Sequence, residues 1–272
     1  MLDVIYINKR DNYEIRGIYM RIGICQIKVI EGDIERNINY IEDAIKTHSN
    51  EKLDLICFPE LCISGYDFDI IKRKKDEKAL LSKLAKKYSI KTVAGISSFE
   101  SDKYYDSACI WNEDGDLILE YKKIHLWGDE IKLFNNGEDI NVIEIDGCKI
   151  GVMICADLGF AEMSKIMSLN SCDLIICPSA WYSPYEDLFK LMVKARAAEN
   201  QLYVIGINRA TGDIPLCGNS CICDPSGIMI AESNTTEEDY ISVDIDIAKV
   251  KERRKEIPWL KMRLPNIYNK YL

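Results

Sequence analysis

Histidine is scarce in this chain, which contains only His48 and His125 among its 272 residues. A thiol nucleophile usually uses a histidine as its base, so a cysteine enzyme with this sequence would need a different base. A zinc site would want two ligand pairs at a suitable spacing, usually with histidine. The only cysteine cluster, Cys217, Cys221 and Cys223, lacks that arrangement. We therefore predict no metal.

Long apolar runs are absent as well. No stretch approaches the roughly 18 apolar residues of a membrane span, and the charged first twenty residues contain no apolar core of a signal peptide. Those residues also differ from the packed pattern that follows, so we predict a dispensable extension over 1–19 with a start at Met20. The 11 cysteines are odd in number and most lie in apolar runs, as expected for core residues of a cytoplasmic protein.

A strongly basic segment is missing too. The formal net charge is -9, and the tetrad Lys72-Arg73-Lys74-Lys75 runs directly into Asp76-Glu77, as in a solvated loop and helix start. Nucleic-acid binding needs clustered cations for phosphate contacts, so we predict no nucleic-acid partner. A hydrophobic fraction of 47% and a charged fraction of 29% are ordinary for a soluble globular protein.

The hydrophobic pattern predicts alternating strands and helices, followed by a block of strands, in one α/β domain over residues 20–272. The predicted strands are Arg21–Ile27, Leu53–Phe58, Lys91–Ser98, Tyr105–Trp111, Leu117–Tyr121, Val142–Ile145, Cys148–Ile154, Leu174–Cys177, Leu202–Asn208, a hairpin over Gly218–Ile230, and Tyr240–Ile245. The predicted helices run from an N-cap at Asp33 to His48, over Glu77–Tyr88, from near Glu162, and over Tyr185–Gln201. Pro178 is expected to end its strand.

Three reactive side chains follow predicted strand ends: Glu60, Lys123 and Cys155. Sites in open α/β sheets gather beyond the carboxyl ends of strands. Taken singly, each residue is more often a loop carboxylate, a surface lysine or a core cysteine. Together they supply a complete chemistry without histidine: burial would raise the pKa of Glu60, which could take the thiol proton. Lys123 and the backbone N–H of Ala156 could hold an oxyanion.

The segments around these residues resemble the three signatures of the nitrilase superfamily of carbon–nitrogen hydrolases. They are Phe58-Pro59-Glu60-Leu61 with Gly65-Tyr66, Tyr121-Lys122-Lys123-Ile124-His125-Leu126, and Gly151-Val152-Met153-Ile154-Cys155-Ala156-Asp157. Further likeness covers Pro178-Ser179-Ala180-Trp181, the run from Ala195 to Val204, and Asp224-Pro225-Ser226-Gly227. The resemblance spans residues 21–272. It implies a four-layer α-β-β-α sandwich that forms a homodimer, with Glu60 as base, Lys123 rather than Lys122 as the lysine, and Cys155 as nucleophile.

The resemblance also assigns supporting positions. Glu130 matches a second glutamate that places substrate and lysine, and His125 matches a structural histidine that orients its loop. His48 matches nothing and is expected at a solvated helix end. Gly159 departs from the family pattern. The resemblance implies that relatives acting on ω-amides of dicarboxylates hold the free carboxylate with a basic residue near this position, so Arg209 or Lys132 would have to replace it here.

The resulting prediction is a cysteine-dependent hydrolase that converts a small linear amide, an ω-amide by preference, into an acid and ammonia through a thioester. It requires no cofactor. The predicted pocket consists of Trp127, Trp181, Tyr182, Asn208 and Arg209, together with Ala156. Hydrolysis of an N-carbamoyl compound, a nitrilase reaction, and a non-catalytic binding or assembly role on the same fold remain alternatives. A thiol-redox role lacks a Cys-x-x-Cys pair.

Overall fold

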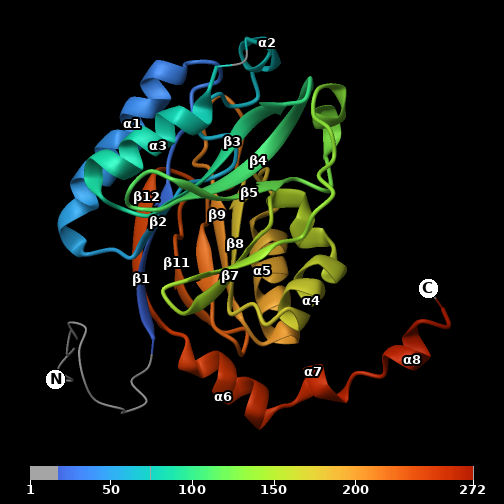
Figure 1. Ribbon diagram of the computed structural model, residues 1–272. Helices are drawn as coiled ribbons and strands as arrows, with labels where there is room; N and C mark the ends of the chain where they lie inside the picture. The colour runs from blue at the N-terminus through green and yellow to red at the C-terminus, as the bar shows by residue number, and fades with distance from the viewer. Residues whose placement is uncertain (1–17, 74, 272) are drawn as a thin grey trace.

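Two six-stranded mixed sheets form the centre of the computed structural model, which describes residues 18–73 and 75–271 (Figure 1). In the first sheet the strand order is β12-β1-β2-β3-β4-β5. Its strands are β1 (Tyr19–Gln26), β2 (Leu55–Cys57), β3 (Thr92–Glu100), β4 (Lys103–Trp111), β5 (Leu117–Lys122) and β12 (Asp239–Asp246). The strands β1, β2 and β3 are parallel, and antiparallel strands flank them on both sides.

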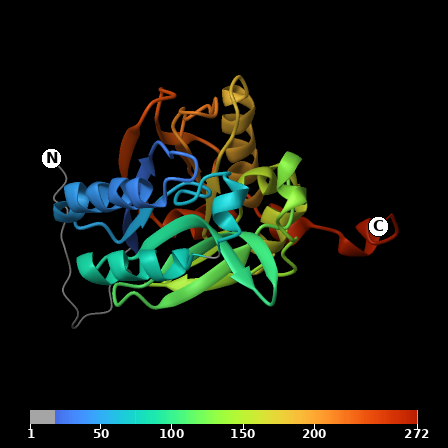
Figure 2. The same cartoon turned by 90° about the horizontal axis from the view of Figure 1, so that it is seen from above.

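Two helices cover the outer face of the first sheet, as Figure 2 shows from above. They are α1 (Ile34–His48) and α3 (Glu77–Tyr88). The side chains of Asp33 and Asp76 accept hydrogen bonds from backbone N–H groups of the first turns, which is why each helix begins where the sequence predicts. Apolar residues such as Ile41, Ile45 and Leu81 then pack against the sheet in one buried cluster.

The second sheet has the order β11-β10-β9-β8-β7-β6. Its strands are β6 (Val142–Ile145), β7 (Cys148–Val152), β8 (Leu174–Ser179), β9 (Tyr203–Asn208), β10 (Cys221–Cys223) and β11 (Met229–Glu232). The helices α4 (Ala161–Leu169) and α5 (Glu186–Asn200) cover its outer face. A continuous apolar cluster joins these helices to the second sheet and then to β1 and β4 of the first. This arrangement confirms the predicted α-β-β-α sandwich.

Short elements complete the chain. They are η1 (Ser49–Glu51), α2 (Phe68–Ile71), η2 (Gly128–Lys132), η3 (Cys155–Gly159), α6 (Ala248–Glu256), α7 (Trp259–Met262) and α8 (Pro265–Tyr268). The last two helices form a C-terminal arm, residues 257–271, that leaves the body of the molecule (Figure 1). Among the described residues, no helix is both long and apolar enough to span a bilayer.

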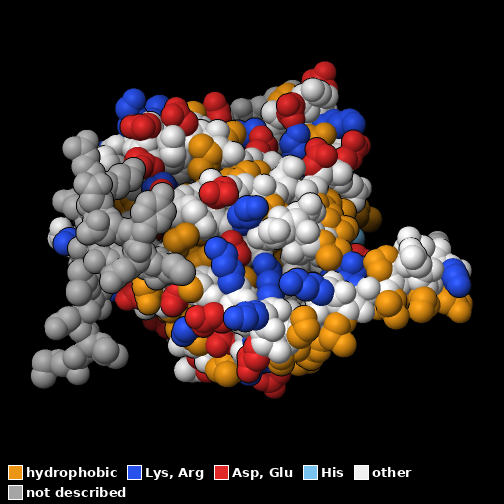
Figure 3. All heavy atoms as spheres, turned by 60° about the horizontal axis from the view of Figure 1, so that its bottom comes forward, with side chains coloured by type: hydrophobic (Ala, Val, Ile, Leu, Met, Phe, Trp, Pro, Cys, Tyr) orange, Lys and Arg blue, Asp and Glu red, His pale blue; other side chains and the backbone are white. Residues whose placement is uncertain are grey.

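Helix α6 carries a short basic run. Lys and Arg side chains gather on the face shown in Figure 3, and α6 contributes Lys249, Lys251 and the stretch 253–255. Two of these cations are already paired, Arg253 with Glu256 and Arg254 with Asp173.

Three sequence predictions need correction. Pro178 does not end its strand, since β8 runs to Ser179 and pairs with β9 at this position. The neighbouring β7 stops pairing at Ile176, so the missing N–H of Pro178 costs no ladder hydrogen bond. His48 does lie at a helix end, but its side chain is only 20% exposed, because its ring stacks on Tyr240 with 3.4 Å between ring centroids.

The boundary of the N-terminal extension is also different. β1 begins at Tyr19, and the carbonyl of Ile18 accepts a hydrogen bond from Ile247 N. These two residues are therefore part of the domain. The rest of the predicted extension, residues 1–17, lies outside the described residues.

Candidate active site

Cys155 lies at the turn that connects β7 to α4. β7 ends at Val152 and the short helix η3 begins at Cys155, whose backbone has a φ of +43°. A non-glycine residue in this left-handed region is strained by about 1–3 kcal/mol, and such strain is typical of residues held in a functional position. The thiol residue is 8% exposed. Of Cys155, Glu60 and Lys123, Cys155 is the residue that solvent can reach, because the other two are fully buried.

Glu60 follows β2 and is held against the neighbouring strand β3. The N–H of Gly95 donates to the Pro59 carbonyl, and the Gly95 carbonyl accepts from Cys62 N. A Cβ at Gly95 would lie 2.8 Å from the Pro59 oxygen and would also collide with Glu60 Cα. The absence of a side chain at position 95 therefore lets the Glu60 loop pack directly on the sheet.

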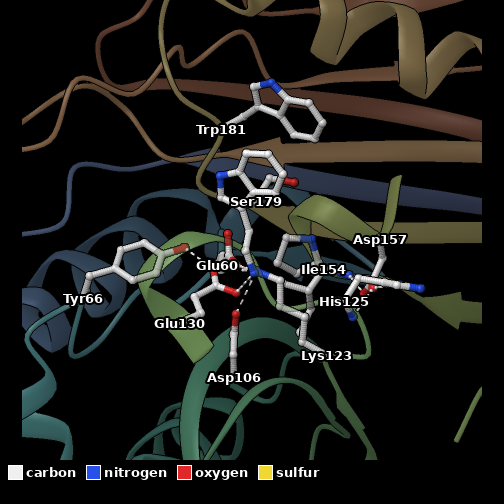
Figure 4. Close-up of polar contacts among 12 residues, drawn as sticks. Glu60, Tyr66, Asp106, Lys123, His125, Glu130, Ile154, Asp157, Ser179 and Trp181 are labelled. Atoms are coloured by element: carbon white, nitrogen blue, oxygen red, sulfur yellow. Dashed lines mark hydrogen bonds and ion pairs between the residues drawn. The ribbon is translucent and has the colours of Figure 1, made fainter. Parts of the chain in front are cut away.

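Lys123 directly follows β5 and points into the same buried space. Its Nζ lies 2.5 Å from Glu60 Oε1, 2.8 Å from Glu130 Oε1 and 3.3 Å from Asp106 Oδ2 (Figure 4). Lys122, one residue earlier, points outward and pairs with Glu100 at the surface. The structure thus brings Lys123, and not Lys122, to Glu60.

Glu130 is the second glutamate beside the lysine. Its two carboxylate oxygens accept hydrogen bonds from three donors: Lys123 Nζ, the Tyr66 hydroxyl at 3.2 Å and the Trp127 N–H at 2.9 Å. These bonds hold the loop after β5 close to the lysine. Tyr66 belongs to the motif around Glu60, but its hydrogen bond to Glu130 is visible only in the three-dimensional structure.

A network of hydrogen bonds centred on Asp157 connects the segment of Lys123 to the segment of Cys155. Its carboxylate accepts from the Tyr121 hydroxyl at 2.6 Å, from the Ile154 N–H at 3.0 Å and from the His125 N–H at 3.0 Å. The His125 ring also bonds to Asp157 through Nδ1 at 2.7 Å (Figure 4). The ring stacks on Phe160 with 3.5 Å between centroids. His125 therefore orients the loop, as predicted.

The electrostatics differ from the sequence prediction at Glu60. Burial alone would raise its pKa, but the charge of Lys123 and the hydrogen bond from its ammonium help to outweigh burial and hold the pKa below its usual range. Burial would lower the pKa of Lys123, yet Glu60 and Asp106 hold it well above normal. Burial raises the pKa of the Cys155 thiol well above normal, and Glu60 adds to that effect. The resting site therefore contains an ionised base and a neutral thiol.

The predicted pocket residues have different surroundings. Trp127 is 68% exposed and Tyr182 is 41% exposed, whereas Asn208 is fully buried. The Asn208 side chain accepts from the Trp181 N–H at 2.7 Å and donates to the carbonyls of Trp181 and Gly218. Its amide is thus used to hold the backbone of Trp181.

Arg209 is a buried cation beside Tyr66, whose hydroxyl group donates a hydrogen bond to Glu130. It pairs with Glu31 through Nη2, and its guanidinium carbon lies 5.8 Å from the centre of the Tyr66 ring. Its Nε and Nη1 have no hydrogen-bond partner among residues 18–73 and 75–271. Lys132, the other candidate for binding a substrate carboxylate, is exposed and pairs with Asp129.

Three carboxyls in the described part of the chain are close enough to share a metal ion: Glu60, Asp106 and Glu130. The ammonium of Lys123 already lies among them, at the distances given above. A lysine in that position supplies the positive charge that a metal would bring. The sequence did not identify Asp106, because an aspartate within a strand gives no indication of which side chains from other segments will lie next to it.

Comparison with known proteins agrees with this geometry. A family model described as carbon-nitrogen hydrolase matches residues 21–255. A Schizosaccharomyces pombe protein named a probable nitrilase is 32% identical over 268 residues, which cover 94% of this chain and 97% of that protein. The 2-oxoglutaramate amidase of Bacillus subtilis is 31% identical over 248 residues, covering 87% and 95% respectively.

The fold has close structural counterparts as well. The crystal structure of an amidase from Nesterenkonia sp. superposes with a TM-score of 0.84 at 23% identity, over 95% of this chain and 98% of the amidase. The family model spans most of the chain, and two relatives exceed 30% identity over nearly their whole length. The chain therefore belongs to the carbon–nitrogen hydrolase family of the nitrilase superfamily.

Proposed function

We propose that the chain hydrolyses a small linear amide to a carboxylic acid and ammonia, with Cys155 as nucleophile, Glu60 as general base and acid, and Lys123 as the oxyanion donor. The observation that carries the proposal is the set of contacts among these residues: a buried Glu60–Lys123 pair at 2.5 Å beside a partly accessible thiol. Glu60 and Lys123 both act on the thiol of Cys155: the charge of Glu60 raises the pKa of the thiol, and the charge of Lys123 lowers it.

The reaction begins with the neutral thiol. Because the pKa of Cys155 is raised and that of Glu60 is lowered, the proton moves to Glu60 as the sulfur–carbon bond forms, and not before. The carbonyl electrons move to oxygen. Lys123 Nζ and the Ala156 N–H stabilise that oxyanion, each donor being worth about 3–4 kcal/mol when well placed.

The tetrahedral intermediate then collapses. Glu60 gives its proton to the leaving nitrogen, the carbon–nitrogen bond breaks and ammonia departs, leaving a thioester on Cys155. Glu60 next takes a proton from water as the water attacks the thioester. The carbon–sulfur bond breaks, the acid leaves, and the proton returns from Glu60 to sulfur. No step requires a cofactor.

An ω-amide, which carries a carboxylate at its far end, is the preferred substrate class. Arg209 supports this preference, because its Nε and Nη1 are buried donors without partners among the described residues, and such donors favour a ligand that can accept from them. The nearby Glu31 already balances part of the charge of Arg209. The 2-oxoglutaramate amidase of Bacillus subtilis carries the name of one such activity.

The chain is further proposed to act as a homodimer. The C-terminal arm exposes Trp259, Met262, Leu264 and Ile267, and apolar side chains line the arm where it projects from the body (Figure 3). An exposed apolar stripe of this kind fits burial against a second copy. Sedimentation of the full chain should give a dimer, and a chain truncated after Glu256 should sediment with a smaller mass.

Ammonia release tests the reaction. The purified protein, with Cys155→Ala alongside, should be assayed on simple amides, ω-amides of dicarboxylates, N-carbamoyl compounds and nitriles. Release from an ω-amide by the wild type only is the expected result. Release from a nitrile or an N-carbamoyl compound instead would replace the proposed substrate class while keeping the nucleophile. Equal release by Cys155→Ala would exclude Cys155.

The contribution of Arg209 has its own test. Arg209→Gln should raise KM for an ω-amide at least tenfold while changing KM for a neutral amide little, because only the former carries a charge to lose. Glu31→Gln is the matched control: it frees the full charge of Arg209 and should lower KM for the ω-amide. Equal effects of Arg209→Gln on both substrates would contradict the assignment.

A further inference from the structure

Asp106 is a buried carboxyl next to the catalytic cluster that the reaction above does not use. It lies on β4, opposite Ser97 of β3, and its backbone carbonyl accepts a hydrogen bond from Lys123 N at 2.8 Å. Its side chain is fully buried. Neither carboxyl oxygen has a hydrogen-bond donor among residues 18–73 and 75–271, although Oδ2 lies 3.3 Å from Lys123 Nζ.

The charges around Asp106 do not balance if every acid is ionised. Glu60, Asp106 and Glu130 each place a carboxyl oxygen within 4.8 Å of the others. Among residues 18–73 and 75–271, Lys123 is the only cation in contact with all three. Full ionisation would leave two excess negative charges in a buried space. When like charges share such a space, at least one of them takes up a proton.

The hydrogen bonds indicate which carboxyl holds that proton. Glu130 accepts from three donors and Glu60 accepts from Lys123, so both are supported as anions. Asp106 has no donor, and Glu60 Oε2 has none either. A proton on Asp106 turns an unsatisfied acceptor into a donor for Glu60 and so satisfies both side chains.

We infer that Asp106 is a protonated carboxylic acid in the active enzyme and that it donates a hydrogen bond to Glu60, acting as a positioning residue for the general base. This inference rests on the proposed role of Glu60. Burial raises the pKa of Asp106 well above its usual range; Lys123 opposes that effect, whereas Glu60 and Glu130 add to it. The titratable groups facing the cluster from other elements are Cys155 and Tyr66.

A neutral Asp106 has two consequences for the reaction. It holds the glutamate carboxylate in one orientation, with one oxygen on Lys123 and the other on Asp106. It also leaves the third N–H of Lys123 without a competing anion, because Nζ donates only two hydrogen bonds among the described residues. That N–H is then available to the oxyanion. An ionised Asp106 would attract it away.

Infrared difference spectroscopy tests the protonation state without any substrate. The spectrum of the wild type minus that of Asp106→Asn, at neutral pH, should contain the C=O stretch of a protonated carboxyl. Glu130→Gln is the matched control, because Glu130 is the other carboxyl of this cluster whose pKa is raised, and the band should persist in that variant. A wild type without the band, or a band lost only in Glu130→Gln, would overturn the inference.

Kinetics test the positioning role. Asn can donate an N–H to Glu60 from the same place, so kcat/KM of Asp106→Asn should fall less than tenfold. Asp106→Ala has no donor, and its kcat/KM should fall more than a hundredfold while its KM changes little. Asp106→Asn as inactive as Asp106→Ala would show that a neutral donor is not what the site needs. A failure of the proposed substrate class would leave the infrared result unaffected.

Discussion

Replacing Lys123 with methionine keeps nearly the same side-chain volume, shortens the chain by one atom, and removes the charge and the hydrogen-bond donors. The lost oxyanion donor should lower kcat/KM by about 10²–10³-fold. Removing one partner of a buried ion pair also costs about 3–5 kcal/mol of stability, because Glu60 and Glu130 would be left as uncompensated anions. Some of that cost is offset when a carboxyl takes up a proton.

The same variant should change the pH dependence in a known direction. Burial raises the pKa of Glu60, and the charge of Lys123 is the largest effect that lowers it. Without its charge the pKa of Glu60 rises, so the acidic limb of the residual activity should move to higher pH. Ammonia release measured from pH 4 to pH 9 would detect this shift, and thermal unfolding would report the stability.

Lys122→Met is the matched control, one residue away. Lys122 pairs with Glu100 at the surface, and an exposed pair contributes about 0–1 kcal/mol. Its kcat/KM should stay close to that of the wild type. If Lys122→Met were the severe variant, or if the acidic limb of Lys123→Met did not move, the reasoning about Lys123 would be wrong.

Three further predictions concern packing and charge outside the triad. Glu77 is buried, and burial raises its pKa to about 7. The contribution of Glu77 to folding stability is therefore complete below about pH 4.5 and is lost as the pH rises through 7. Urea unfolding should show that the wild type loses about 3 kcal/mol of stability over this pH window relative to Glu77→Gln. Gly95→Ala should lower kcat/KM at least tenfold and cost about 1–3 kcal/mol, whereas Gly159→Ala, whose added Cβ meets nothing within 4 Å, should be neutral in both assays. A chain that begins at Ile18 should retain full activity and the same melting temperature, and a loss of either would mean that residues 1–17 belong to the functional protein.

Local signals predicted the parts of the structure that depend on neighbouring residues. Asp33 was the signal for the start of the first helix, and in the structure its side chain does cap that helix. The three motifs identified Glu60, Lys123 and Cys155 because each of these residues follows a predicted strand and is flanked by a recognisable run of residues. The structure then brings Glu60 and Lys123 into direct contact.

The errors arose where the outcome depends on residues distant in sequence. The pKa of Glu60 falls because the charge and hydrogen bonds of Lys123, 63 positions away, act with other contacts to outweigh burial. Asp106 is part of the cluster only because β4 and β5 pair and place it beneath Lys123. Pro178 stays in its strand because β7 stops short of it. In these cases a single sequence shows the residues but does not show which residues will be next to them in the folded protein.

Rapid-quench mass spectrometry of the enzyme during turnover tests the central claim, that Cys155 carries the acyl group. The account predicts an adduct with the mass of the substrate minus ammonia, located on the peptide that contains Cys155, which appears before the acid and is absent in Cys155→Ala. The other ten cysteines are buried and free, and none of them should be modified. Amide turnover without any adduct, or with the adduct on another residue, would contradict the account.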